Sequence, residues 1–353
     1  MKKVFLIASI FTISFHSKAQ VLQDSIRAFA EKEVQEFAKD YPGVSVSVSL
    51  KGSIVWNKAM GFSDINHKKP VTRDTKFNIY STSKPITGLA YLKLIHSGQL
   101  SSLNVSVREI DPSLPDSYKN IEIRHLLTHT SGIRHYNGDW DSFSNLRCEN
   151  PAEALKHFVD DPLEFKPGEK ELYTTYGMVL ASHLLEKITG LKYIDAINSL
   201  LPFTKKLLLD SENIDKATPY KRVEGKYEEI VNLSAECKYA GGGLIASSDQ
   251  LAEAGQILYS DSFIPSNDRN KLIQSQFSEK NPYGGISFAM GSYSKGDRLN
   301  VTTGGASPGG RSYLLVYANL KVAVAITTNC QAGGGEKLLQ LCKALARKFA
   351  GLN

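Results

Sequence analysis

The two ends of the chain carry the period-two hydrophobic pattern of β-strands, and the long stretch between them does not. Residues 44–49 alternate valine with serine, and after the Lys51-Gly52 turn residues 54–59 form a second run. Near the other end, runs with the same pattern cover residues 286–294, 299–303, 312–317 and 322–328. Such alternation is typical of strands. Because strands at both ends need partners, the pattern predicts one antiparallel sheet built from two distant parts of the chain.

The middle of the chain, from about residue 81 to residue 235, has apolar residues mainly at helical spacing. Amphipathic helices are also predicted at residues 26–37 and 338–349, beside the strands. We therefore expect an α+β fold, with an antiparallel sheet flanked by helices plus a helical subdomain. The expected domain covers residues 20–353, with a sheet lobe at about 20–80 and 239–353 and a helical subdomain at about 81–238. A cleft is expected where the two parts meet.

The first residues resemble a secretory signal. Lys2 and Lys3 precede an apolar run over residues 4–15, and small residues at positions 17 and 19 precede Gln20. This pattern predicts a signal peptide over residues 1–19 and an exported protein, periplasmic or secreted. The apolar run is too short to cross a bilayer, so we expect no stable membrane span after cleavage.

Charge and cysteine content exclude several classes of protein. The chain has 42 Lys and Arg against 36 Asp and Glu, a net charge of +6, and the mature chain would keep +3. No Lys/Arg-rich run is present, so no nucleic-acid partner is expected. The cysteines lie far apart without a Cys-x-x-Cys pair, at positions 148, 237, 330 and 342. We predict that they are non-catalytic, and the sequence leaves their pairing open.

The segment Ser81-Thr82-Ser83-Lys84 carries the clearest chemical signal. It follows a strand-like run and opens a predicted helix that Gly98 closes. Residues three apart share one face of a helix, so the Lys84 amine is expected to reach the Ser81 hydroxyl. The N–H groups at a helix start also favour a developing oxyanion. A serine paired with a lysine in this way is a candidate nucleophile.

Two look-alike motifs are less convincing. Ser292-Tyr293-Ser294-Lys295 repeats the Ser-x-x-Lys spacing, but on a predicted strand, where residues three apart point to opposite faces. Gly305-Ala306-Ser307-Pro308-Gly309 fits the Gly-x-Ser-x-Gly pattern, but Pro308 lacks the N–H that an oxyanion hole would need there. We interpret both as chance matches.

Other segments accompany Ser81 in a specific order along the chain: His125-Leu126-Leu127-Thr128-His129-Thr130-Ser131-Gly132, Phe165-Lys166-Pro167-Gly168, Tyr173-Thr174-Thr175-Tyr176-Gly177, Tyr239-Ala240-Gly241-Gly242-Gly243-Leu244 and Thr302-Thr303-Gly304-Gly305. With these motifs the chain resembles the serine β-lactamase and penicillin-binding-protein superfamily, near class C β-lactamases, DD-peptidases and related esterases. Residues 131–136 and 165–177 look most like the mitochondrial β-lactamase-like serine protease branch. The likeness covers roughly residues 40–350 and implies a β-lactamase/transpeptidase-like fold.

The resemblance also implies roles for particular residues. Ser81 would be the nucleophile that forms an acyl-enzyme, Lys84 its proton partner, and Tyr173 the tyrosine that moves protons between Ser81 and the leaving group. The backbone N–H groups of Ser81 and Gly305 would form the oxyanion hole. Thr303 and Gly304 would lie on the strand that borders the substrate, with Thr175 and Thr302 as further substrate-binding positions.

Two positions depart from the usual pattern of the superfamily. Thr175 stands where many members have asparagine, although the mitochondrial branch resembles this chain there. Thr302 replaces the usual lysine or histidine, which removes a cation that would hold a substrate carboxylate. Its absence favours esters or uncharged amides over a dedicated β-lactamase activity. Arg311 is a possible substitute cation.

Some alternatives remain open at this point. Tyr176 could be the functional tyrosine, with Tyr173 in a packing role. His125 and His129 have the i, i+4 spacing of helical metal ligands, but a structural role is favoured. The glycines at 241–243 could cradle a phosphate, but close backbone packing is favoured. The proposed acyl transfer needs no metal and no organic cofactor.

The sequence thus predicts an exported serine hydrolase that acts through an acyl-enzyme on an amide or ester, as a peptidase, an esterase or a β-lactamase-like enzyme. Its expected partner is a small-molecule or peptide substrate, and the sequence does not indicate an oligomeric state. The alternative is a non-catalytic, penicillin-binding-like recognition protein that keeps the fold. Loss of the cation at position 302 is the observation that favours this alternative.

Overall fold

The computed structural model describes residues 21, 23–211, 214–231, 233–267, 286–287, 290–295 and 298–352. The predicted signal peptide over residues 1–19 lies outside this range, as does most of the turn expected at residues 295–297. Within the described residues no helix combines the length and the apolar character needed to cross a bilayer.

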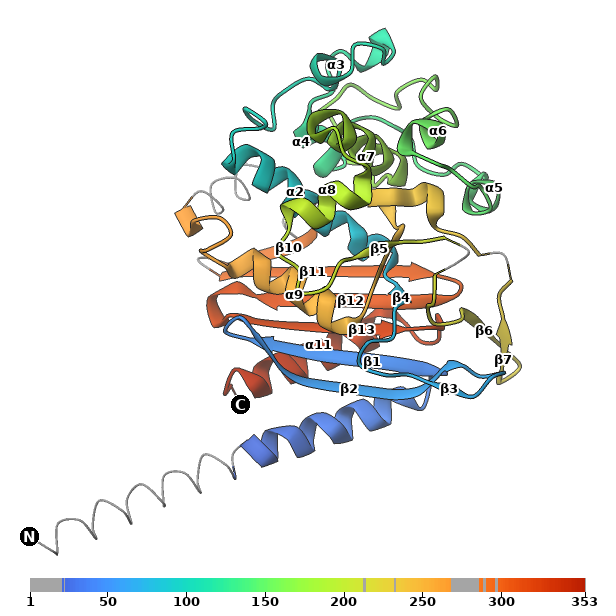
Figure 1. Ribbon diagram of the computed structural model, residues 1–353, viewed down its shortest axis with the longest axis vertical. Coiled ribbons are helices and arrows are strands. Elements are labelled where there is room, and N and C mark those ends of the chain that lie inside the picture. The colour runs from blue at the N-terminus through green and yellow to red at the C-terminus, as the bar shows by residue number, and fades with distance from the viewer. Residues whose placement is uncertain are drawn as a thin grey trace, which may run out of the picture.

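The central element is one antiparallel sheet formed by both ends of the chain, as the period-two pattern predicts (Figure 1). In the described residues its strand order is β3-β2-β1-β13-β12-β11-β10-β9. The strands are β1 (Gly43–Leu50), β2 (Ser53–Asp64), β3 (Lys69–Pro70), β9 (Ile286–Ser287), β10 (Met290–Lys295), β11 (Arg298–Ser307), β12 (Gly310–Tyr317) and β13 (Val322–Thr328). Strand β1 pairs with β13, so the two ends of the chain meet at the middle of the sheet.

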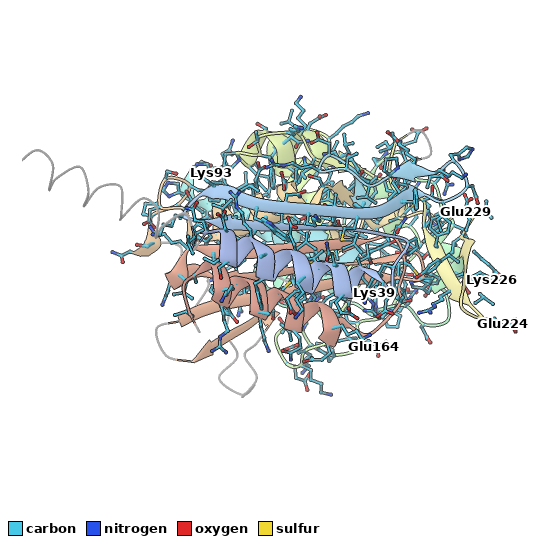
Figure 2. The ribbon with its side chains drawn as sticks, turned by 90° about the horizontal axis from the view of Figure 1, so that it is seen from below. Lys39, Lys93, Glu164, Glu224, Lys226 and Glu229 are labelled. Carbon is cyan, nitrogen blue, oxygen red and sulfur yellow. A yellow bond between two sulfur atoms is a disulfide. The ribbon has the colours of Figure 1, made fainter. Side chains whose placement is uncertain are left out.

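Helices cover both faces of this sheet. The valines of β1 pack with a helix over residues 23–38 and with α11 (Gly335–Phe349), which lie side by side below the sheet (Figure 2). The serines of β1 face α9 (Ser248–Tyr259), where Ser47 donates a hydrogen bond of 2.6 Å to Asp249. Both faces of β1 are therefore buried, and hydrogen bonds to α9 satisfy its polar face.

A helical region lies beyond the β11 side of the sheet (Figure 1). Its helices are α2 (Ser83–His96), α3 (Val107–Ile110), α4 (Ile123–Leu127), α5 (Trp140–Ser144), α6 (Pro151–Leu155), α7 (Thr175–Thr189) and α8 (Tyr193–Leu200). Gly190 ends α7 in a left-handed conformation with a φ of 69°, as expected for a helix stop. The boundaries that divide the chain into two lobes stay a prediction.

The middle of the chain also contains short strands that the hydrophobic pattern does not reveal. A three-stranded sheet joins β4 (Phe77–Asn78), β8 (Leu244–Ala246) and β5 (Leu208–Leu209), and β6 (Tyr220–Val223) pairs with β7 (Lys226–Glu229). Two to four residues are too few to establish a period. The pairing of β4 with β8 matters for function, because it brings the segment before Ser81 next to the segment after Gly243.

Candidate active site

Ser81 lies in a short 3-10 turn, η1 (Tyr80–Thr82), between β4 and α2. Tyr80 has a φ of 46°, a left-handed conformation that a bulky residue adopts only where its surroundings impose it. The carbonyl of Ile79 accepts hydrogen bonds from Thr82 Oγ1 and from Ser312 Oγ on β12, each 2.5 Å long. These contacts fix the turn against the sheet and leave Ser81 partly exposed between buried neighbours.

The Ser81 hydroxyl contacts the two side chains that the sequence analysis singled out. Tyr173 donates a hydrogen bond of 2.7 Å to Ser81 Oγ, and Lys84 Nζ lies 3.2 Å from the same oxygen. Lys84 is 1% exposed, and its amine also donates to the Gly241 carbonyl. Its Nζ lies 4.8 Å from the centre of the Tyr173 ring. The fold therefore brings together three side chains that are separated by as many as 92 residues.

Two histidines position Tyr173. The ring of His129 lies 4.6 Å from the Tyr173 ring, and His135 meets it edge-on at 5.4 Å. The backbone N–H groups on either side of Tyr173 are also held, because Leu172 N–H donates to the His129 carbonyl and Thr174 N–H to His129 Nδ1, over 2.8 and 3.1 Å. Tyr173 itself keeps 38% of its surface exposed. The sequence placed His135 within the 131–136 run that carries the resemblance but indicated no role for it, because it lies in a loop and carries no periodic signal.

Both histidines are uncharged at neutral pH. Burial, with a smaller effect of the Lys84 charge, lowers the pKa of His129 to about 3 and that of His135 to about 4. His125 is buried too, and its Nδ1 accepts the Glu122 N–H over 3.1 Å. In the described part of the chain, no group of three or more His, Cys, Asp or Glu side chains is placed to hold a metal ion. His125 and His129 thus contact backbone groups, in line with a structural role.

Strand β11 borders Ser81 on the other side. A Cβ built on Gly305 would lie 2.9 Å from Ser81 N and 2.3 Å from Ile79 O, so these backbones touch. Strand β10 pairs with one edge of β11 as far as Thr302, whereas β12 pairs with the other edge of β11 as far as Ser307. One edge of residues 303–307 therefore has no strand partner in the described residues, and this is the stretch next to Ser81.

A family model described as Beta-lactamase matches residues 26–341. The chain belongs to the beta-lactamase family. The serine beta-lactamase-like protein LACTB, mitochondrial, of Homo sapiens is 26% identical over 292 residues, 62% of this chain and 53% of LACTB. The chain spans about half the length of this curated relative. The resemblance expected from the ordered motifs is confirmed.

Solved structures confirm the β-lactamase/transpeptidase-like fold. EstCE1, a hydrolase with promiscuous acyltransferase activity, matches with a TM-score of 0.77 at 19% identity, covering 92% of this chain and 100% of EstCE1. The D-amino acid amidase from Ochrobactrum anthropi SV3, complexed with L-phenylalanine amide, matches with a TM-score of 0.73 at 17% identity, covering 94% of this chain and 99% of the amidase. Both likenesses extend over nearly the whole chain.

Thr302 lies apart from the side chains that surround Ser81 in this β-lactamase-family site. A Cβ on Gly304 would meet the Tyr313 ring at 3.3 Å, on the face opposite to Gly305. Strand alternation places Thr302 on that same face, where its hydroxyl hydrogen bonds to Tyr313. Arg311 pairs in register with Ala306 and approaches Gly335 at the start of α11, so it also lies on the face away from Ser81. Thr303, by alternation, shares the face of Gly305.

Thr175 is buried and packs beneath the site. Its N–H donates to His135 Nδ1 over 3.2 Å, and a Cβ on Gly241 would lie 2.4 Å from its methyl group. Glycine at 241 therefore lets the backbone approach closely enough for its carbonyl to reach Lys84. Tyr176, the alternative tyrosine, is fully buried and donates a hydrogen bond of 2.7 Å to Asp139. Of these two tyrosines, Tyr173 is the one whose hydroxyl contacts Ser81.

Within the described part of the chain, none of the four cysteines contacts Ser81. Cys148 and Cys237 form a disulfide, and Cys330 and Cys342 are free and buried. The disulfide joins the loop after α5 to η3 (Glu236–Gly241), the segment that presents Gly241 to Lys84. The sequence left this pairing open because the two residues are 89 positions apart.

Proposed function

We propose that this protein is a serine hydrolase that cleaves an amide or ester through an acyl-enzyme on Ser81. The observation that carries the proposal is the convergence of Tyr173 and Lys84 on Ser81 Oγ, at 2.7 and 3.2 Å. A serine becomes a nucleophile when adjacent groups accept its proton, and hydrogen-bond contact is the geometric requirement. Membership of the beta-lactamase family supports the same chemistry.

In the first half of the proposed reaction, Ser81 Oγ attacks the carbonyl carbon of the substrate, and its proton passes to whichever of Tyr173 and Lys84 is deprotonated. The carbonyl oxygen becomes an oxyanion, which the N–H groups of Ser81 and Gly305 would stabilise. When the carbon to leaving-group bond breaks, the pair returns the proton to the leaving nitrogen or oxygen. In the second half, water attacks the acyl-enzyme by the same route and releases Ser81.

Three further contacts would keep the proton path in place. The Gly241 carbonyl fixes the Lys84 amine, and the neutral rings of His129 and His135 support Tyr173 without adding a second positive charge beside Lys84. The edge of residues 303–307, which has no strand partner within the part of the chain that the structure describes, would hydrogen bond an extended substrate as an additional strand. Because position 302 lacks a cation, we propose an esterase- or peptidase-type hydrolase rather than a dedicated β-lactamase.

We further propose that the protein is exported. The charged and apolar start of the chain supports this, and so does the Cys148–Cys237 disulfide, because disulfides persist in oxidising compartments.

The decisive variant is Ser81→Ala. A panel of p-nitrophenyl esters, a chromogenic cephalosporin and a D-alanyl-D-alanine peptide would identify a substrate for the wild type. With that substrate, Ser81→Ala should lower kcat by several orders of magnitude, and a fluorophosphonate probe should label only the wild type. Wild-type rates in a folded Ser81→Ala protein would disprove the mechanism. If the wild type neither turns over a substrate nor is labelled, a recognition protein that keeps the fold is favoured instead.

A further inference from the structure

Lys238 is a buried cation without an acidic partner. It belongs to η3, is 7% exposed, and lies with its Nζ 5.0 Å from the centre of the Trp140 ring. Among the described residues its amine makes no hydrogen bond and no ion pair in the observed contacts. The amine keeps some contact with solvent, because it is not one of the fully enclosed side-chain atoms that lack a hydrogen-bond partner. Partial removal of an ammonium from water is still costly unless an acceptor compensates it. The Trp140 ring offers only part of that compensation.

The nearest acid is already occupied. Asp210 is close enough to raise the pKa of Lys238, but its carboxylate accepts from the Lys216 amine and from the Ala235 N–H. Burial and, to a smaller extent, the charge of Lys84 still lower the pKa of Lys238 to about 8. The amine is therefore mostly protonated at pH 7, and it is available to an anion that comes from outside the chain.

Lys238 belongs to the same 3-10 segment as the residue that holds Lys84. It lies three residues before Gly241, whose carbonyl accepts from the Lys84 amine. Its charge also contributes to the lowered pKa of His135, the ring that meets Tyr173 edge-on. The disulfide at the neighbouring Cys237 holds this segment in place.

We propose that Lys238 is a specificity-determining residue that binds a carboxylate of the substrate beside Ser81. This inference rests on the proposed hydrolase function and names its substrate class, carboxylate-bearing amides or esters, in place of the uncharged substrates that the loss of a cation at position 302 favours by itself. Position 302 carries no charge and Arg311 lies on the opposite face of the sheet, so neither provides a cation next to Ser81. Lys238 provides that cation from another part of the chain, through the 3-10 segment that also holds Lys84.

The test compares matched substrates that differ only in charge. One pair places the charge on the acyl side, as the p-nitrophenyl monoester of adipic acid and its uncharged monoamide analogue. The other pair places it on the leaving group, as the butyrate esters of 4-hydroxybenzoate and 4-hydroxybenzamide. The readout is the ratio of kcat/KM for the charged and the uncharged member, measured for wild type, Lys238→Met and Lys226→Met. Lys226 lies on the outlying β6–β7 hairpin and gives the same change of charge (Figure 2).

In the wild type, the charged member should be preferred in at least one pair. Lys238→Met should lower that ratio about tenfold or more, because a hydrogen bond between charged groups is lost, and Lys226→Met should leave it unchanged. In the unmodified protein the ratio should also fall as the pH rises from 7 to 9.5, because Lys238 loses its proton. This second measurement does not depend on the folding of any variant. His135, whose pKa is about 4, does not titrate in this range.

An unchanged ratio in Lys238→Met for both pairs, or a ratio that does not vary with pH, would overturn the inference. Failure of the proposed function looks different, because the wild type would then hydrolyse none of the four esters, or Ser81→Ala would hydrolyse them equally well.

Discussion

Gly305 offers the sharpest test of how β11 and the Ser81 turn fit together. Replacing it by alanine would put a Cβ 2.3 Å from Ile79 O, 2.6 Å from Ser312 Oγ and 2.9 Å from Ser81 N. None of these neighbours is free to move. The Ile79 carbonyl accepts two side-chain hydrogen bonds, and Ser312 Oγ also contacts Thr82 Oγ1 at 2.9 Å. The strand or the turn must therefore shift by about 1 Å to restore ordinary contact.

The shift has a predictable magnitude. Overpacking of this kind costs about 1–3 kcal/mol of unfolding free energy, offset by about 0.4–1 kcal/mol because alanine restricts the unfolded chain. A displacement of about 1 Å, or the loss of one oxyanion donor, lowers kcat by about 10²- to 10³-fold. We therefore expect Gly305→Ala to lower kcat by two orders of magnitude or more and to destabilise the protein by about 1–2 kcal/mol.

The neighbouring glycine is a matched control. A Cβ on Gly304 meets the ring of Tyr313 at 3.3 Å, on the other face of the sheet, and the Ser312 carbonyl at 3.9 Å, which is ordinary van der Waals contact. Gly304→Ala should therefore keep kcat within about threefold of wild type, since a side-chain ring can yield by a few tenths of an ångström. Ester turnover gives kcat and urea unfolding gives the free energy. If Gly305→Ala keeps wild-type kcat, or if both variants lose activity equally, the close contact of Gly305 with the Ser81 turn is not what catalysis requires.

Two further predictions concern acid sensitivity and processing. The pKa of His129 is about 3 in the folded protein, whereas a histidine in the unfolded chain takes up its proton near pH 6.5. The free energy of unfolding should therefore fall as the pH drops from 6.5 to 3, by up to about 1.4 kcal/mol per pH unit. His129→Asn keeps an acceptor for Thr174 N–H and tolerates the φ of 56° at this position. Urea unfolding should show that the unfolding free energy of this variant depends less steeply on pH than that of the wild type. An equal dependence would contradict the low pKa of His129. For export, the intact mass of protein recovered from outside the cytoplasm should correspond to a chain that begins at Gln20 and is two hydrogens lighter for the Cys148–Cys237 disulfide. Recovery of only the full-length, reduced chain inside the cell would refute the export proposal.

Local patterns along the chain predicted a good part of this protein. The alternation in residues 44–49 and the runs at 299–303, 312–317 and 322–328 predicted strands of the sheet, because side-chain direction in a strand depends only on position. The single strand predicted over residues 286–294 was wrong, because β9 and β10 are two separate strands that pair antiparallel within this range. The spacing of Ser81 and Lys84 predicted their contact for the same reason, since one turn of helix brings them together. The order of the motifs was specific enough to indicate the family.

Other features depend on contacts between residues far apart in sequence. Tyr173 lies 92 positions from Ser81, and Gly241 lies 157 positions from Lys84. A local period carries no information about such pairs, and only the packing of the helical region against the sheet sets their distances.

The residue types and short spacings of the sequence determined the strands, the first helix turn of the site and the kind of chemistry that Ser81 can perform. The tertiary structure decided which face of β11 meets Ser81 and which faces away, because a strand must pack before its two faces acquire different neighbours. It thereby placed Thr302 and Gly305 on opposite faces of the sheet. It also left Lys238 buried without an acidic partner in the segment that holds Lys84, which the sequence cannot reveal because the burial of a charge depends on the whole fold.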